Sequence, residues 1–196
     1  MSNAARQLVL ASTSRYRKAL LERLALEFVT FNPDVAETRQ PGETADALVR
    51  RLALAKARSG AAAYPDGLII GSDQVADCDG EILGKSGGHA AAVAQLRRLS
   101  GRRVLFHTGL CLYDARSDVQ RLDVIPFAVH FRSLDDARIE RYVDADRPYD
   151  CAGSFKSEGL GISLFTRMEG DDPTALVGLP LIRLTQWLNE AGVEVP

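Results

Sequence analysis

The stretch from residue 103 to residue 134 constrains the fold more than any other part of the chain. It reads RVLFHTGLCLYDARSDVQRLDVIPFAVHFRSL, and apolar and polar residues alternate along two long runs on either side of DARSD. A period of two residues is typical of β-strands, because successive side chains point to opposite faces of a sheet. The stretch therefore predicts a large antiparallel hairpin.

The first half of the chain predicts strands that alternate with helices. The apolar run QLVLAS precedes leucines at helical spacing in residues 20–24, and EFVTFN precedes a long helix over residues 44–64. A buried strand, LIIG, is then interrupted by polar residues 72–74 before a hairpin that turns at Asp79-Gly80. This order predicts an α/β fold with a mixed, twisted sheet and flanking helices.

The second half adds three helical patterns, at residues 90–99, 134–146 and 179–192, and a glycine-rich loop that enters a strand near residue 165. Repeats, low-complexity tracts and linkers are absent from the sequence. We therefore expect residues 1–196 to form a single domain.

The charge balance excludes bulk attraction to nucleic acid polymers or to an anionic membrane, since 24 basic residues stand against 26 acidic ones and the net charge is −2. The N-terminal apolar run is too short for a leader or a spanning helix. Cys78, Cys111 and Cys151 match no zinc spacing and favour a reducing, cytoplasmic location. An anionic ligand would need a local group of cations.

Three cations lie at positions where they could form a local group that binds an anion. Arg17 shares the leucine face of the first helix, next to Ser14 in the N-cap region, and helix N-termini attract phosphate. Lys56 continues the apolar face of the second helix. Lys85 lies in GEILGKSGG, which is one residue short of a P-loop. We expect the three to surround an anion; the alternative is that each lies at the surface and Ser14 only caps its helix.

Two acidic residues indicate a metal. Asp73 follows the run LIIGS directly, so we expect it at the C-terminal end of a strand, where α/β proteins bind ligands. Glu37 lies in the loop before the helix that carries Lys56. A few carboxylates beside bound phosphate are what Mg²⁺ or Mn²⁺ requires. The alternative for Asp73 is a turn residue or a helix cap.

Seven blocks of sequence, spread over nearly the whole chain, carry a resemblance to a known family. They are LASTSRYRKALL, RLALAKA, IIGSDQV, GEILGK, HTGL, CAGSFKSEGLGI and GDDPTALVGLPL. In this order they resemble the Maf family of nucleoside triphosphate pyrophosphatases, most closely the branch that acts on 7-methyl-GTP. The resemblance implies a Maf/inosine triphosphatase-like fold with two lobes around a deep cleft, a divalent cation, and a homodimer in many members.

The resemblance also implies roles for single residues. The family's essential serine and arginine fall on Ser14 and Arg17, and its loop glutamate falls on Glu37. Its lysines fall on Lys56 and Lys85, and its catalytic aspartate falls on Asp73, as base, metal ligand or both. The sequence departs from the family pattern at three positions, where Arg15 and Ser86 replace prolines and Ala36 replaces an acidic residue.

Three positions divide the branches of the family by base preference, and here they hold Tyr16, Gln74 and Glu158. A glutamate can accept hydrogen bonds from N1–H and the N2 amino group of guanine, and methylation at N7 makes the ring cationic, which favours an aromatic face. The resemblance thus implies hydrolysis of 7-methyl-GTP to 7-methyl-GMP and pyrophosphate. The alternatives are a pyrimidine triphosphate (dTTP or UTP) pyrophosphatase and a nucleotide-binding regulator of cell division.

Overall fold

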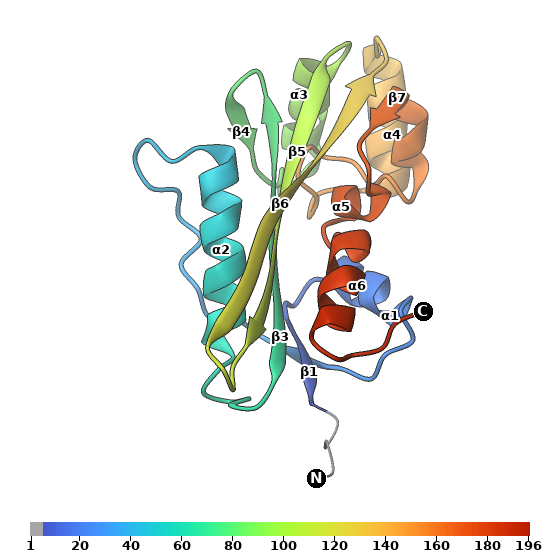
Figure 1. Cartoon of the computed structure of the whole chain (residues 1–196). Helices are drawn as coiled ribbons and strands as arrows, with labels where there is room; N and C mark the ends of the chain where they lie inside the picture. The colour runs from blue at the N-terminus through green and yellow to red at the C-terminus, as the bar shows by residue number, and fades with distance from the viewer. Residues whose placement is uncertain (1–5) are drawn as a thin grey trace.

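One mixed sheet organises the molecule, which a computed structural model describes from residue 6 to residue 196 (Figure 1). Its strand order is β2-β1-β3-β5-β6-β7, and β4 pairs with β3. The strands are β1 (Leu8–Ala11), β2 (Val29–Phe31), β3 (Leu68–Cys78), β4 (Glu81–Leu83), β5 (Arg103–Asp114), β6 (Val119–Phe131) and β7 (Phe165–Glu169). β1 runs parallel to β2 and β3, and the other pairs are antiparallel. The predicted mixed α/β fold is confirmed.

Helices cover both faces of this sheet. They are α1 (Arg15–Glu22), α2 (Ala45–Ser59), α3 (His89–Leu99), α4 (Asp136–Asp146), the 3₁₀ helix η1 (Leu160–Leu164), α5 (Pro173–Val177) and α6 (Leu181–Glu190). α2 packs against β3 and β5 on one face, while α5 and α6 contact the opposite face, with α1 beside α5 (Figure 1). α3 and α4 pack together near the end of the sheet that carries β4 and β7. None of the helices in residues 6–196 is long and apolar enough to cross a membrane.

The predicted hairpin of residues 103–134 is confirmed as the longest pairing in the sheet. β5 and β6 pair from Arg103 opposite His130 to Asp114 opposite Val119. The predicted turn at Asp79-Gly80 is also present, with a positive φ at both residues, as a tight hairpin turn requires.

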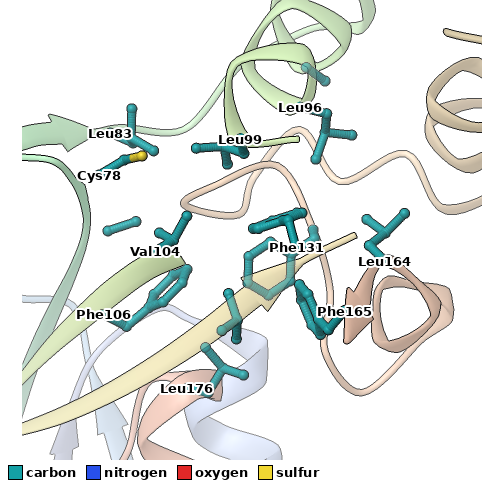
Figure 2. Packing of buried hydrophobic residues seen from close by; sticks show 14 of the residues in the cluster. Cys78, Leu83, Leu96, Leu99, Val104, Phe106, Phe131, Leu164, Phe165 and Leu176 are labelled. Carbon is teal, nitrogen blue, oxygen red and sulfur yellow. The ribbon is translucent and has the colours of Figure 1, made fainter. Parts of the chain in front are cut away.

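The largest core cluster lies under α3 and α4 and is rich in aromatic rings (Figure 2). Phe155 meets Phe106, Phe131 and Phe165 edge to face, at centroid distances of 5.4, 5.7 and 4.8 Å. Such pairs contribute about 0.5–1.5 kcal/mol each beyond the burial of their area. They fix the segment around Phe155 against the sheet, close to the loop that carries Glu158.

Two expectations, one about β3 and one about α2, are wrong. The polar residues 72–74 do not interrupt β3, because Ser72 to Gln74 keep pairing with β5 in an unbroken antiparallel ladder. Asp73 is therefore in the middle of β3 and not at its C-terminal end. The parallel pairing with β1 does end nearby, where Ala11 lies opposite Gly71.

The helix predicted over residues 44–64 is also shorter, since α2 ends at Ser59 and Gly60 caps it.

Two glycines allow α2 to lie unusually close to the sheet. A Cβ atom at Gly71 would be 2.1 Å from the carbonyl oxygen of Ala53, and one at Gly109 would be 2.3 Å from that of Val49. Both carbonyls belong to α2. Real Cβ atoms do not approach oxygen this closely, so only glycine permits the contact. The close approach brings the last turns of α2 against β3, where Lys56 meets Asp73.

We predict that Gly71→Ala lowers the free energy of unfolding by about 2 kcal/mol or more, because the added methyl group must push α2 away from the sheet. Urea denaturation followed by circular dichroism measures this change. Gly84→Ala is the control, since a Cβ atom there would have no neighbour within 4 Å. Equal stability of the two variants would show that α2 does not depend on the contact.

Candidate active site

A cavity of about 840 Å³ opens between the N-terminus of α1, the loop before α2, the middle of β3, β4 and residues 150–158. Each site residue predicted from the sequence lines it: Ser14, Tyr16, Arg17, Glu37, Lys56, Asp73, Gln74, Lys85 and Glu158. The residues come from segments that lie up to 144 positions apart, as Ser14 and Glu158 show. Its size is typical of a pocket for a small molecule.

The buried amine of Lys56 is the centre of this cavity. Its side chain is only 7% exposed, and its Nζ lies 2.6 Å from Oδ1 of Asp73 and 2.5 Å from Oε1 of Glu37. Asp73 is buried as well, whereas the Glu37 side chain is 61% exposed. The hydrogen bond from Lys56 lowers the pKa of Glu37, and the nearby charges of Lys85 and Arg17 act in the same direction. The pair of carboxylates is thus held together by one ammonium group.

Arg17 brings a second positive charge from the first turn of α1. Ser14 is the N-cap of that helix, and its Oγ accepts a hydrogen bond from the backbone N–H of Arg17 at 3.4 Å. The Nε of Arg17 donates to the carbonyl oxygen of Gly178 at 2.9 Å. Burial lowers the pKa of Arg17 while Asp73 and Glu37 oppose the change, and a guanidinium stays protonated in any case. Within residues 6–196, Arg17 makes no salt bridge with a carboxylate.

Lys85 lies at the edge of the cavity. Its backbone forms an isolated antiparallel bridge with Ala152, which ties the loop after β4 to the loop that carries Glu158. The side chain is exposed and pairs with no carboxylate of the described chain. The cavity therefore contains two cations, Arg17 and Lys85, that form no salt bridge with a carboxylate of residues 6–196.

The residues that were expected to contact a base are held in different ways. The amide nitrogen of Gln74 donates to Ala175 O at 2.7 Å and lies 3.0 Å from Thr108 Oγ1, so mainly its carbonyl oxygen is free for a ligand. Glu158 is exposed, and within residues 6–196 its carboxylate accepts one hydrogen bond, from the hydroxyl of Ser157 at 3.3 Å. Glu158 is thus a free acceptor at the mouth of the cavity.

Tyr16 is more constrained than its sequence position suggests. The guanidinium carbon of Arg15 lies 4.8 Å from the centre of the Tyr16 ring. The Nη2 of Arg15 donates to the Tyr16 hydroxyl at 2.7 Å. The hydroxyl is also 3.3 Å from the carboxylate of Asp150. Burial is the main cause that raises the pKa of Tyr16, so the phenol stays neutral near pH 7. Arg15, one of the departures from the family pattern, already covers one face of the ring.

Sequence reasoning missed the contribution of α5 and the glycine that ends it. The carbonyl oxygen of Gly178 accepts from Arg17 and lies 2.9 Å from the buried hydroxyl of Ser72. Gly178 has a φ of 114°, a conformation that favours glycine. The block TALVGLPL contained this glycine, and a helix ending in a left-handed glycine was the available signal.

The carboxylates fit a divalent cation of the magnesium type. No cluster of three or more His, Cys, Asp or Glu side chains within residues 6–196 is arranged to hold a metal alone. Glu37 and Asp73, however, direct one oxygen each to the same Lys56 nitrogen, so these oxygens lie near one another in a cavity lined by cations. Mg²⁺ is commonly held by one or two carboxylates together with substrate phosphate and water, and this donor set agrees with that pattern.

Comparison with known proteins identifies the family. Residues 7–191 match the family described as Maf-like protein. The chain belongs to the Maf family. A Pseudomonas aeruginosa protein named 7-methyl-GTP pyrophosphatase is 56% identical over 96% of this chain and 98% of its own length. Proteins of the same name from Colwellia psychrerythraea and Aromatoleum aromaticum are 53% and 54% identical, over 96% and 97% of this chain and 94% and 98% of their own.

We predict that Glu37 contributes to stability in a pH-dependent way. Its folded pKa lies below the ordinary 4.5, so its stabilising ion pair is present above pH 4.5 and is lost as the pH falls toward the folded value. The difference in the free energy of unfolding between the wild type and Glu37→Gln should therefore be constant near pH 7 and shrink below pH 4.5. Because the side chain is largely exposed, the difference should be small.

Urea denaturation at several pH values between 7 and 3 measures this difference. Glu27→Gln is the control, since Glu27 is exposed and makes no salt bridge in the described residues. A Glu37→Gln difference that grows on acidification would contradict the ion pair.

Proposed function

We propose that this protein is a metal-dependent nucleoside triphosphate pyrophosphatase that hydrolyses 7-methyl-GTP to 7-methyl-GMP and pyrophosphate, and so removes a modified nucleotide from the pool. One observation carries the proposal: the cavity that holds the Glu37–Lys56–Asp73 cluster is also lined by Arg17 and Lys85. The names of the relatives support the reaction and the substrate.

The cations account for binding of the triphosphate. A nucleoside triphosphate carries nearly four negative charges near neutral pH, and attack by water adds charge to the phosphoryl oxygens in the transition state. Arg17 presents a guanidinium that lacks a salt-bridge partner in the described chain, and Lys85 adds an exposed ammonium at the edge of the cavity. Ser14 and the N-terminus of α1 supply hydrogen-bond donors and partial positive charge. These groups would orient the α-phosphorus over Asp73.

Glu37 and Asp73 would hold a divalent cation, Mg²⁺ or Mn²⁺, together with the phosphate oxygens. When bound, such a cation supplies charge neutralisation and makes a neighbouring water more acidic. Asp73 accepts its hydrogen bond from Lys56 through Oδ1, and Oδ2 makes no hydrogen bond with residues 6–196. The Asp73 carboxylate would therefore accept a proton from the attacking water through Oδ2, with Lys56 fixing its orientation.

Recognition of the base would depend on the mouth of the cavity. The free carboxylate of Glu158 would accept hydrogen bonds from N1–H and the amino group of guanine, which pyrimidines do not offer. The carbonyl oxygen of Gln74 would provide a further acceptor, because its amide nitrogen is tied to α5. The carboxylates of Glu158 and Asp150 favour a cationic, N7-methylated ring over a neutral one. The face of Tyr16 that Arg15 leaves open would pack against that ring.

We also propose the domain organisation, the location and the oligomeric state of the chain. We expect residues 1–196 to form one domain with two lobes, and the chain to act in the cytoplasm as a homodimer. Cys78, Cys111 and Cys151 are all free thiols, which agrees with a reducing compartment.

We predict that a panel of 7-methyl-GTP, GTP, dTTP, UTP, CTP and ITP with Mg²⁺ gives the highest kcat/KM for 7-methyl-GTP. Asp73→Asn should lose activity on every nucleotide by at least about 100-fold, because the proton acceptor and a metal ligand are removed. Glu158→Gln should lose mainly the preference for 7-methyl-GTP. The rate of pyrophosphate release measures the activity of the wild type and of both variants. Highest activity on dTTP or UTP would favour a pyrimidine pyrophosphatase, and nucleotide binding without any release would favour a regulator.

We predict that chelation abolishes turnover and that Mg²⁺ or Mn²⁺ restores it. Glu37→Gln should raise the metal concentration required for half-maximal activity by about tenfold or more, since a charged oxygen ligand becomes neutral. The measurement is pyrophosphate release as a function of free metal concentration. Glu43→Gln, which removes the partner of Arg51 outside the cavity, is the control. Full activity in excess chelator would rule out the metal site.

A further inference from the structure

A second cavity, of about 540 Å³, lies away from the candidate active site, between α4, η1 and the residue that follows β6. α4 contacts η1 at this end of the molecule, the end to which β7 also runs (Figure 1). Three arginines line the cavity, Arg132, Arg138 and Arg141, together with Tyr142, Leu160, Ser163 and Leu164. No residue is shared with the lining of the first cavity.

The three arginines differ from most others in the described chain because they have no acidic partner. Residues 6–196 pair many arginines with carboxylates, such as Arg97 with Asp136 at 2.7 Å, but no salt bridge there includes Arg132, Arg138 or Arg141. All three side chains are exposed. Three cations therefore line one cavity, and no carboxylate of the described residues pairs with them.

Acidic residues are available on α4, but they are directed elsewhere. Asp136 pairs with Arg97 on α3, and Glu140 and Asp144 contact His89 at 3.4 and 3.0 Å. Asp135 accepts the backbone N–H of Arg138 as the N-cap of α4. The positive charge of the cavity is therefore not neutralised by the helix that carries two of its arginines.

The backbone of η1 holds the third arginine in place. The N–H of Arg132 donates to Leu164 O at 2.8 Å, and its side-chain Nε donates to Ser163 O at 3.2 Å. The terminal nitrogens of its guanidinium donate to no acceptor within residues 6–196 and could donate to a ligand. Arg138 and Arg141 are three residues apart on α4 and so project from one side of the helix. Guanidinium groups match the oxygens of phosphate through paired hydrogen bonds.

We propose that this second cavity is a binding site for a phosphate or polyphosphate anion, such as inorganic phosphate or pyrophosphate. The three guanidinium groups supply the donors, and Leu160 and Leu164 provide an apolar wall. The site does not depend on the proposed function, because it is defined by residues that the reaction does not use. Its wall includes η1, which begins two residues after Glu158 in the chain.

Isothermal titration calorimetry with pyrophosphate in metal-free buffer tests the proposal without any turnover. The wild type should show two classes of site. Arg138→Gln/Arg141→Gln should weaken one class by about tenfold or more, because charged hydrogen bonds are lost, and leave the rate of pyrophosphate release unchanged. Arg97→Gln, which alters a paired arginine on α3, should keep both classes. Arg17→Gln should weaken pyrophosphate binding at the other class of site, the candidate active site, so that binding at the arginine-lined cavity can be measured by itself.

Parallel titrations identify the ligand. Tighter binding of pyrophosphate than of phosphate indicates a polyphosphate ligand, and equal binding indicates a single phosphate group. Succinate binding as tightly as phosphate would overturn the ligand class. One class of site in the wild type, unchanged in the double variant, would overturn the site itself. If the double variant does not fold, Arg132→Gln alone serves the same purpose, with the same outcomes.

Discussion

The contact of the Lys56 ammonium with Asp73 and Glu37 is the interaction on which the rest of the cavity depends. A buried ammonium without a counter-charge would be strongly destabilising, and two carboxylates this close would repel each other without a cation between them. The lysine therefore holds both carboxyl groups near one another in the absence of ligand. In the proposed reaction, Asp73 and Glu37 would hold a divalent cation, and Oδ2 of Asp73, which makes no hydrogen bond within residues 6–196, would accept the proton.

The glycines of the sheet make this contact possible. Because Gly71 and Gly109 have no Cβ, the backbone of α2 lies almost directly on β3 and β5. A side chain at either position would move α2 outward and carry Lys56 away from Asp73. The close contact of Lys56 with Asp73 thus follows from the backbone packing of α2 on Gly71, two residues before Asp73, and on Gly109. On the opposite face, Gly178 at the end of α5 fixes Arg17 through its carbonyl oxygen.

Much of the site could be predicted from residues that break a local pattern. Lys56 on an apolar helix face and Arg17 beside leucines indicated inward charges, and both line the cavity. The uninterrupted course of β3 could not be predicted, because the pairing of Asp73 with Gly109 joins residues 36 positions apart. The packing of Arg15 on Tyr16 depends on Asp150, which comes from a distant loop. Local patterns therefore predicted which residues line the cavity, whereas their partners required the tertiary structure.

Steady-state kinetics of Lys56→Met test the central role of this lysine most directly. The substitution removes the charge and keeps an unbranched, flexible side chain that is about one heavy atom shorter. We expect kcat/KM for pyrophosphate release from 7-methyl-GTP to fall by about 100-fold or more in a variant that circular dichroism shows to be folded. A folded Lys56→Met protein with kcat/KM within about twofold of the wild type would contradict a reaction centred on Glu37, Lys56 and Asp73.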